Sequence, residues 1–438
     1  MTELLPSGAD LLATGLTVLR AHQERSLATI SLIAAENAMV PFARLPLICD
    51  LYNRYMFEQD PDPAAGGWNF PSAKSAAWLE TGLAVPLLRR LAGAEHVNVR
   101  PLSGLHAMEM VITALGGQSG ETVACIATGQ GGHYATADVA RRLGHPVVHL
   151  PGCGPHELDL EQLAEVCEMY RPSLIYLDQC HALDPVDTAR VVTAVKQVSP
   201  ATHVHVDISH PLGLVLGGAL PNPLAEGADS MSASTHKTFP GPQKGIIATR
   251  DASVHAKIQA VQPQLVSNHH IGAVAALGLS LAAFADQAGA YAHAVVATAR
   301  SLGKELAHAG WEVAGAEFGY TRTHQLWVTT PRLAAREAAE RLYAAGIHVN
   351  WLSDLPLKQP ALRLGLAEAA WTGLTPADMP RLAAIMTSAV EGERPPVDLA
   401  RQTAELRSTL AYPFAPALTR DAVGDASWTA ASFVGQIA

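Results

Sequence analysis

Short apolar runs rich in β-branched residues alternate with amphipathic stretches between about residues 98 and 250. The runs that predict strands are "VNVRPLS", "TVACIA", "PVVHL", "SLIYLD", "HVHVDI", "DSMSAS" and "GIIATR". Helical stretches such as "GLHAMEMVITAL" and "TARVVTAVKQV" lie between several of them. Strands that alternate with helices of this length are typical of βαβ units, in which a mostly parallel sheet is covered on both faces. The pattern therefore predicts an α/β fold whose ligand lies at the carboxyl ends of the strands.

The pattern changes on either side of this region and divides the chain into three parts. Residues 1–55 show no strand alternation and predict an N-terminal helical arm, and residues 56–285 predict the large domain. Residues 286–438 predict a smaller C-terminal α+β domain, with candidate strands "WEVAGA", "THQLWVTT", "GIHVNW" and "ALRLGL" and the helical "RLAAREAAERLYAAG". The uncharged run 271–285 is too short to span a bilayer and predicts a buried helix.

Composition and charge exclude several classes of function. The 438 residues carry a formal net charge of −10 without a dense Lys/Arg cluster, which argues against a nucleic-acid partner. The five cysteines are odd in number and form no C-x-x-C pair, and no cationic segment precedes the first apolar residues. These features predict a cytoplasmic protein without a disulfide framework, signal peptide or membrane partner.

The sequence gives little support for a nucleotide-binding site or a metal-binding site. No G-x-G-x-x-G follows the first strand, and no G-x-x-x-x-G-K-[ST] occurs. The stretch "HVHVDISH" places His203, His205, Asp207 and His210 close together, and an H-x-H-x-D pattern can bind a metal ion. On a strand, however, residues 203, 205 and 207 share one face, and only the residue at the strand end must meet the ligand. We predict no metal.

Asp207 and Lys237 suggest a different chemistry. Each lies at the end of a predicted strand, and Lys237 is part of "STHKTFPGPQKG", where the chain enters a turn rich in glycine and proline. Most lysines are solvated surface charges. A pyridoxal-phosphate enzyme, however, needs an anion that keeps the ring nitrogen protonated and a lysine that holds the aldehyde as a Schiff base. These two residues satisfy both needs.

Several motifs then become recognisable together. They are "SLIAAEN" (31–37), "LYNRY" (51–55), "VNVRPLSGLHA" (97–107), "GQGGHYAT" (129–136), "VDISHPLGLVLGG" (206–218), "STHKTFPGP" (234–242) and "LRLG" (362–365). With these motifs in the family's order over most of its length, the chain resembles serine hydroxymethyltransferase and its relatives. The resemblance implies the aspartate-aminotransferase-like fold, called fold type I among pyridoxal-phosphate enzymes.

The resemblance also implies roles for individual residues. Lys237 would form the Schiff base, Asp207 would pair with the ring nitrogen, His133 would stack on the ring, and His210 would lie near the phenolic oxygen. Ser103 would open the helix whose first N–H groups favour a phosphate. The implied cofactor contacts are Ser103, Gly104, Leu105, His133, Gln179, Asp207, His210, Ser234, His236 and Lys237. The implied catalytic residues are Lys237, Tyr55, His133, Asp207, His236 and Arg363.

Two of these catalytic residues have further implications. Arg363 would bind the substrate carboxylate through two parallel hydrogen bonds. Tyr55 would enter the site from the partner subunit of a homodimer, so that active sites lie at the interface; a core aromatic is the alternative for this residue.

Some positions depart from the family pattern. The folate-using enzymes have a glutamate two residues after the tyrosine, where this chain has Phe57, and Glu58 is shifted by one. A phenylalanine cannot perform acid–base chemistry. Ala35 replaces a serine that touches the substrate carboxylate, Gln243 replaces an arginine, and "QLVSNHH" (264–270) replaces the glycine-rich segment that meets the phosphate across the dimer. These departures predict that the folate-associated chemistry is lost; replacement of the missing glutamate by Glu58 through a local bulge is the alternative.

The remaining features most resemble the threonine transaldolases of natural-product pathways. Such enzymes cleave L-threonine, release acetaldehyde and pass the glycyl unit to another aldehyde, so the expected partners are a small amino acid and an aldehyde. The alternatives are a folate-dependent serine hydroxymethyltransferase, a simple threonine aldolase or racemase, a non-catalytic relative and, on the histidine pattern, a metal hydrolase.

Overall fold

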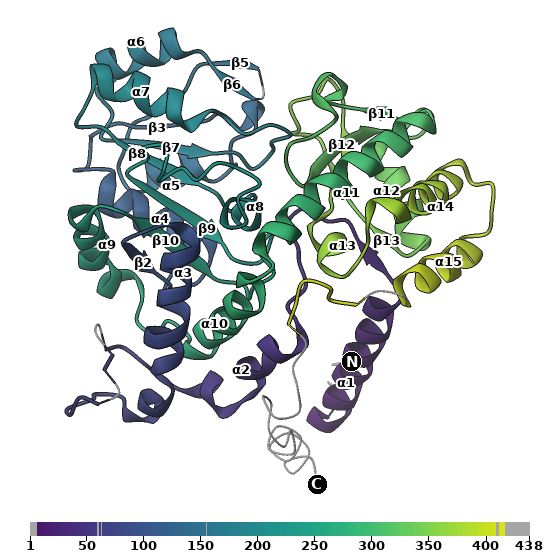
Figure 1. Ribbon diagram of the computed structural model, residues 1–438, viewed down its shortest axis with the longest axis horizontal. Helices are drawn as coiled ribbons and strands as arrows, with labels where there is room; N and C mark the ends of the chain where they lie inside the picture. Colours follow the sequence, from purple (N-terminus) through teal and green to yellow (C-terminus); the bar gives the residue numbers. More distant parts are fainter. Residues whose placement is uncertain (1–6, 59–60, 63, 155, 409–410, 417–438) are drawn as a thin grey trace, which may run out of the picture.

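A seven-stranded sheet forms the centre of the large domain in the computed structural model, which describes residues 7–58, 61–62, 64–154, 156–408 and 411–416 (Figure 1). The strand order is β2-β10-β9-β8-β7-β3-β4. Only β10 runs antiparallel to its neighbours, so the sheet is mostly parallel as predicted. The strands are β2 (His96–Asn98), β3 (Val123–Cys125), β4 (Val147–His149), β7 (Leu174–Asp178), β8 (His203–Asp207), β9 (Ser230–Ser234) and β10 (Gly245–Thr249).

Both faces of this sheet are buried under helices. Leu174 and Tyr176 of β7 pack in a cluster with side chains of α4 (Gly104–Leu115), α5 (Thr136–Arg142) and α9 (Ala252–Leu265). Ile175 and Leu177 alternate with them and pack in a second cluster. Helices that contribute to that cluster include α3 (Val85–Ala92), α6 (Leu160–Tyr170), α7 (Thr188–Val198), α8 (Leu212–Leu216) and α10 (Ile271–Ala285). Burial on both faces explains why the strands read as continuous apolar runs.

The small domain is built on an antiparallel sheet with a core of its own. The long helix α11 (Ala288–His308) leads into this domain, whose strand order is β11-β12-β15-β14 (Figure 1). Its strands are β11 (Glu312–Val313), β12 (Gln325–Thr329), β14 (Asn350–Leu352) and β15 (Ala361–Gly365), and its helices are α12 (Ala335–Ala344), α13 (Ala367–Trp371), α14 (Met379–Glu391) and α15 (Pro396–Ser408). The boundaries at residues 55 and 285 stay predictions, and residues 417–438 lie outside the described residues.

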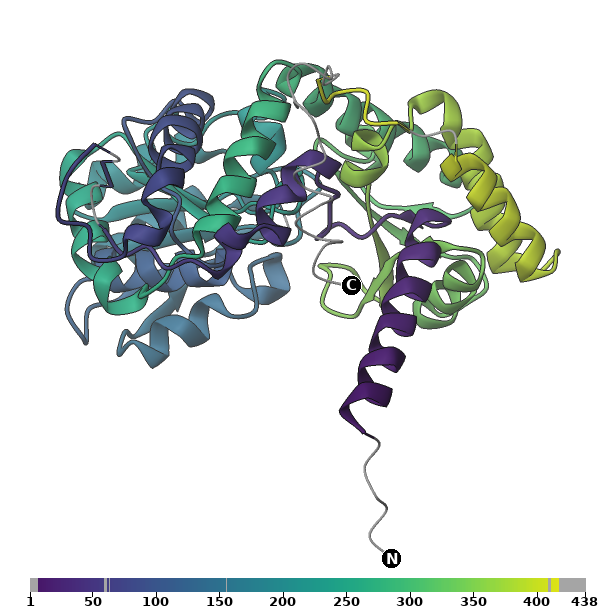
Figure 2. The same cartoon turned by 90° about the horizontal axis from the view of Figure 1, so that it is seen from below.

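The N-terminal arm contains one element that the pattern did not predict. After α1 (Gly8–Leu27), the two-residue strand β1 (Ile30–Ser31) pairs in parallel with β13 (Ile347–His348) of the small domain. A strand of two residues is too short to produce an alternation in the sequence. The helix α1 has no buried residue, and Figure 2 shows it extending away from both sheets. The arm continues through the short helix α2 (Leu45–Ile48) toward the large domain.

No single helix within the described ranges is long and apolar enough to cross a bilayer. Helices α10 and α11 reach that length and composition only when they are taken together, and they are bent by 81° relative to each other. Most residues of α10 are buried in the protein core, as predicted for the run 271–285.

Candidate active site

The sheet brings Lys237 and Asp207 into one pocket at the carboxyl ends of β8 and β9. Asp207 is the last residue of β8, and Lys237 follows the end of β9 by three residues. The pocket is lined by Gly104, Leu105, Met108, His133, Asp178, Gln179, Cys180, Asp207, Ser209, His210, Ser234 and Lys237. Eight of the ten residues predicted to contact a cofactor are in this set, and Ser103 and His236 are not. This is the strand end at which parallel sheets usually bind ligands.

Hydrogen bonds from three segments hold the loop that carries the lysine. The carbonyl of Thr238 accepts from the hydroxyl of Tyr291 at 2.6 Å and from Nδ2 of Asn37 at 3.2 Å. The Thr238 hydroxyl donates to the carbonyl of His210 at 2.5 Å. These bonds fix the backbone next to Lys237 and explain the asparagine of "SLIAAEN". Burial lowers the pKa of Lys237, although the Asp207 charge opposes the shift, so the amine is more readily available in its uncharged, nucleophilic form.

The Asp207 carboxylate is oriented by two donors. Its Oδ1 accepts from the backbone N–H of Ser209 at 2.7 Å, and its Oδ2 accepts from the Tyr176 hydroxyl at 3.0 Å. The parallel register places Asp178 of β7 beside Asp207. Burial raises the pKa of Asp178 to about 8, with a further contribution from Asp207, while a hydrogen bond from Thr136 opposes the shift. A pKa raised in this way favours the neutral acid form of Asp178 near pH 7.

Ser103 and Gly104 form a cradle at the start of α4. The Ser103 side chain accepts from the backbone N–H of His106 at 3.1 Å and caps the helix. A side chain at Gly104 would collide with the hydroxyl of Ser234, so only glycine lets β9 approach the helix this closely. Free N–H groups and the helix dipole at such an N-terminus favour an anion such as a phosphate.

Three histidines near the lysine favour their neutral forms. His133 lines the pocket, and burial lowers its pKa, although Asp207 opposes the shift. Burial and Lys237 lower the pKa of His236 to about 4, and its Nδ1 is buried without a hydrogen-bond partner. Burial, Lys237 and Arg363 lower the pKa of His210 well below its usual value. Neutral imidazoles can accept protons, which is a property that aldol chemistry requires.

Arg363 of β15 reaches the edge of this pocket from the small domain. Its Nη1 donates to Nδ1 of His181 at 3.0 Å and lies 3.9 Å from Sγ of Cys180, which itself lines the pocket. Its Nη2 donates to Oδ1 of Asn350 at 3.3 Å, while its Nε is buried without a partner. The sequence interpretation missed His181, Cys180 and Asn350, because none of them belongs to the motifs that carried it.

Tyr55 is not brought to the lysine pocket within one chain. Its hydroxyl is hydrogen-bonded to Ser267, and its ring lies 4.3 Å from that of Phe70. The segment 264–270 is held by a buried network in which His269 Nε2 and Arg100 Nε each lie 2.8 Å from the carboxylate of Glu80. Tyr55 and the segment predicted to lie across a dimer are therefore neighbours in the same chain.

Glu58 is engaged with the backbone of its own loop. One carboxylate oxygen accepts from the N–H groups of Asn69 at 2.8 Å and Phe70 at 3.1 Å, and the other accepts from Phe57 at 3.1 Å. Burial alone would raise the pKa of Glu58, but the backbone donors outweigh it and lower the pKa. A carboxylate held in this way closes a loop and is poorly placed to deliver protons.

The H-x-H-x-D pattern is dispersed in the fold. His205 lies between the hydroxyls of Ser230 and Ser232, at 2.7 and 2.9 Å, and His203 lies 3.2 Å from Nζ of Lys257. Among the described residues, no group of three or more His, Cys, Asp or Glu side chains is placed to hold a metal ion.

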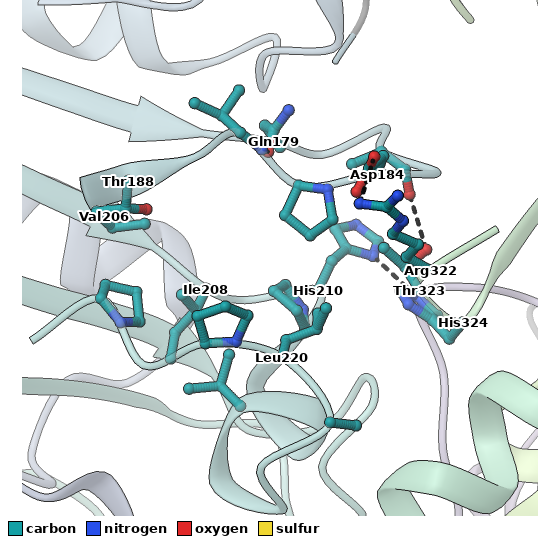
Figure 3. A pocket seen from close by; sticks show the side chains of 18 of the residues that line it. Gln179, Asp184, Thr188, Val206, Ile208, His210, Leu220, Arg322, Thr323 and His324 are labelled. Atoms are coloured by element: carbon teal, nitrogen blue, oxygen red, sulfur yellow. Dashed lines mark hydrogen bonds and ion pairs between the residues drawn. The ribbon is translucent and has the colours of Figure 1, made fainter. Parts of the chain in front are cut away.

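A larger cavity of about 520 Å³ adjoins the lysine pocket and shares Gln179, Asp207 and His210 with it. Figure 3 shows the apolar side chains of Val206, Ile208 and Leu220 around this cavity. On the side of the small domain lie the ion pair of Asp184 with Arg322, at 3.3 Å, and the contact of His210 with His324, at 3.4 Å. The lysine amine belongs to the smaller pocket, which therefore is the candidate reaction site.

A lysine loop at the strand ends of a mostly parallel sheet, faced by a small antiparallel domain, is the architecture of fold type I enzymes. The serine hydroxymethyltransferase family model matches residues 14–386, and the chain belongs to this family. The fold class and the aldol-type transferase activity predicted from the sequence are thereby confirmed.

Individual proteins of known name and one solved structure show which members of this family the chain is similar to. An L-threonine:uridine-5'-aldehyde transaldolase of a Streptomyces species is 43% identical over 381 residues, which cover 86% of this chain and 91% of the relative. The serine hydroxymethyltransferase of Archaeoglobus fulgidus is 32% identical, with 89% of each chain covered. The crystal structure of an L-threonine transaldolase from Pseudomonas fluorescens, in its internal aldimine state, has a TM-score of 0.84 at 25% identity and covers 96% of this chain and 97% of its own.

Proposed function

We propose that this enzyme is an L-threonine transaldolase that uses pyridoxal 5'-phosphate. It would cleave L-threonine, release acetaldehyde and transfer the glycyl unit to a second aldehyde, giving a β-hydroxy-α-amino acid. The 43%, 42% and 40% identical relatives named L-threonine:uridine-5'-aldehyde transaldolase support a nucleoside 5'-aldehyde as acceptor. The observation that carries the proposal is the pocket that unites Lys237 with Asp207 while Glu58 is engaged elsewhere.

The residues of the pocket fit this cofactor. The Gly104–Ser234 cradle at the start of α4 suits a phosphate, and Asp207 supplies the anion that a protonated ring nitrogen needs. The Nε2 of Gln179 is a buried donor without a partner among the described residues, which suits an oxygen acceptor on a ligand. Pyridoxal phosphate, when bound, supplies an electron sink that stabilises negative charge at the amino-acid Cα.

The chain's own residues would bind the substrate and move its protons. Arg363 would bind the carboxylate of threonine, and a neutral histidine, of which His133 lines the pocket, would accept the proton of the β-hydroxyl. The Cα–Cβ bond then breaks, its electron pair stays at Cα, and acetaldehyde leaves. In the second half, Cα forms a bond to the carbonyl carbon of the acceptor, and the stored proton returns to the new hydroxyl.

The same pocket has to keep the glycyl unit from being protonated early. Phe57 has no proton to give, and Glu58 is an ionised acceptor of three backbone hydrogen bonds. Because neither side chain supplies a proton where the folate-using enzymes carry a glutamate, transfer to an aldehyde should exceed release of free glycine.

The test mixes the protein, pyridoxal phosphate and L-threonine, with and without uridine-5'-aldehyde. We expect acetaldehyde release without tetrahydrofolate, an adduct by mass spectrometry, and less free glycine than adduct. Tetrahydrofolate should leave cleavage of L-serine unchanged, in the wild type and in Glu58→Gln alike. Strong stimulation of serine cleavage by tetrahydrofolate that Glu58→Gln abolishes would instead identify a hydroxymethyltransferase.

We propose further that the enzyme is a homodimer with its sites at the interface. The apolar side chains of Leu12, Leu16 and Leu19 on α1 are each more than half exposed, and Leu105 at the pocket is 47% exposed. Exposed apolar side chains on one face of a helix, as on α1, are typical of an interface. Light scattering should give about twice the chain mass of 46.1 kDa. Replacing the three α1 leucines by glutamate should weaken the dimer, whereas Thr14→Glu should not; a monomeric wild type would contradict the proposal.

A further inference from the structure

Arg363 is the only small-domain side chain that the proposed reaction uses, and two neighbours fix its orientation. Arg363 is 6% exposed, with Nη1 bonded to Nδ1 of His181 at 3.0 Å and Nη2 bonded to Oδ1 of Asn350 at 3.3 Å. Asn350 and Arg363 are paired residues of β14 and β15, so the strand register supplies the second contact. The first contact comes from the large domain.

His181 is itself held on three sides. Its backbone N–H donates to the carbonyl of Gly131 at 3.0 Å, in the loop that leads to His133. His181 is 4% exposed, and the Nε2 atom of its ring lies 3.8 Å from Oδ2 of Asp354, a carboxylate that is about half exposed. Because Arg363 can only donate, Nδ1 of His181 must carry the lone pair, so that the neutral ring bears its proton on Nε2, toward Asp354.

The contacts of Arg363 leave its Nε–H and one of the two N–H groups of Nη2 without a partner among the described residues, because Nη2 makes a single bond, to Asn350. A guanidinium has five N–H donors in a plane. His181 occupies Nη1, with Sγ of Cys180 also 3.9 Å away, whereas Nε is buried without a partner. The Nε–H and one Nη2–H lie on the same edge of the planar group, which is the geometry that a carboxylate accepts with two parallel bonds.

We propose that His181 is a positioning residue that turns the Nε–Nη2 edge of Arg363 toward the substrate carboxylate. The inference rests on the proposed function in that it takes Arg363 as the carboxylate anchor. It assigns to a large-domain histidine the task of orienting a small-domain arginine, so that substrate binding depends on a contact between the two domains. Burial and the Arg363 charge lower the pKa of His181 to about 4, although Asp354 opposes the shift, which keeps the acceptor nitrogen free at neutral pH.

The test compares full-length holoenzymes of the wild type, His181→Phe, His181→Gln and Arg363→Lys. KM and kcat for L-threonine are measured from acetaldehyde release, and the dissociation constant of glycine is measured from the absorption change of the bound cofactor. L-Threoninol, which lacks the carboxylate, is the matched control substrate. His181→Phe removes the acceptor, whereas His181→Gln offers an amide oxygen to the same Nη1.

For His181→Phe we expect KM for threonine and the glycine dissociation constant to rise about 10- to 100-fold, the range for a lost hydrogen bond to a charged group. The kcat should stay within about threefold, because the contact is made equally in the ground and transition states. KM for threoninol should not change, and His181→Gln should recover most of the affinity. If His181→Phe does not fold, His181→Ala replaces it in the same measurements.

The possible results distinguish the positioning role of His181 from the proposed transaldolase reaction. An equal loss for threonine and threoninol, or unchanged glycine binding in His181→Phe, would overturn the positioning role while Arg363→Lys still weakens threonine. If Arg363→Lys binds glycine and threonine as the wild type does, the carboxylate anchor lies elsewhere and both fail. Absence of threonine cleavage in the wild type would refute the proposed reaction, and glycine binding would still decide the role of His181.

Discussion

Lys237→Ala should lose all measurable turnover and the absorption band of the Schiff base between lysine and the cofactor. The amine lies in the pocket with Asp207 and His133, and its loop is fixed by bonds to Thr238. Among the described residues that line this pocket there is no second lysine to take its place. Borohydride should attach pyridoxal phosphate irreversibly to the wild-type chain and not to the variant, which mass spectrometry of the tryptic peptide around residue 237 would show. Full activity of Lys237→Ala would end the pyridoxal-phosphate hypothesis.

Lys244 provides the matched control for this experiment. It is a second buried lysine, seven residues further on, and its Nζ donates to the carbonyls of Arg100 at 3.3 Å and His269 at 2.9 Å. Burial lowers its pKa to about 7, with Arg100 adding to the shift and Glu80 opposing it. Lys244→Met should lower the free energy of unfolding through the loss of these bonds, yet it should keep the borohydride-stable attachment of the cofactor. Loss of attachment in both variants would indicate a folding effect.

The sequence was most informative where local pattern and fold agree. The run "GLHAMEMVITAL" became α4 with the same bounds, and 271–285 became the buried helix α10, because a serine cap or a purely apolar stretch marks such elements. The strands of the large sheet were predicted for the same reason, since burial on both faces leaves apolar runs. Asp207 and Lys237 could be singled out because each lies at the end of such a strand.

The residues that the sequence did not reveal depend on contacts across long separations. His181 meets Arg363 from another domain, and Tyr176 meets Asp207 only through the register of β7 and β8. Asp178 gave a signal that could have been used, because "LIYLD" and "HVHVD" end alike and parallel strands bring such ends together. The engagement of Glu58 with Asn69 and Phe70 could not be foreseen, because it depends on how one loop folds back.

Asp207→Asn should keep the cofactor but lower kcat by about 10²- to 10³-fold, the usual effect of removing one charge-stabilising group from an active site. A neutral amide cannot hold a proton on the ring nitrogen, so the electron sink weakens although the pocket stays the same size. Both carboxylate oxygens of Asp207 accept hydrogen bonds, one from the backbone N–H of Ser209 and one from the hydroxyl of Tyr176. An asparagine side chain has only one oxygen, so it can accept only one of these two bonds without rearrangement. Activity within about threefold of the wild type would mean that another group serves the ring nitrogen.

Asp178→Asn, on the neighbouring strand, distinguishes this electrostatic effect from a change of shape. Since the pKa of Asp178 is raised to about 8, the native residue is already neutral at pH 7, and its amide analogue should lose far less activity than Asp207→Asn. The raised pKa of Asp178 also predicts how the free energy of unfolding depends on pH. The folded chain keeps this proton up to about pH 8, whereas an unfolded chain releases it near pH 4, so the stabilisation is complete below pH 4 and is lost as the pH rises to 8. Melting temperatures of the wild type and Asp178→Asn should therefore be measured between pH 5 and 8, where the wild type should lose stability relative to the variant as the pH rises. Parallel curves would show that the Asp178 carboxyl is ionised in the folded chain over this whole range, which would contradict the raised pKa.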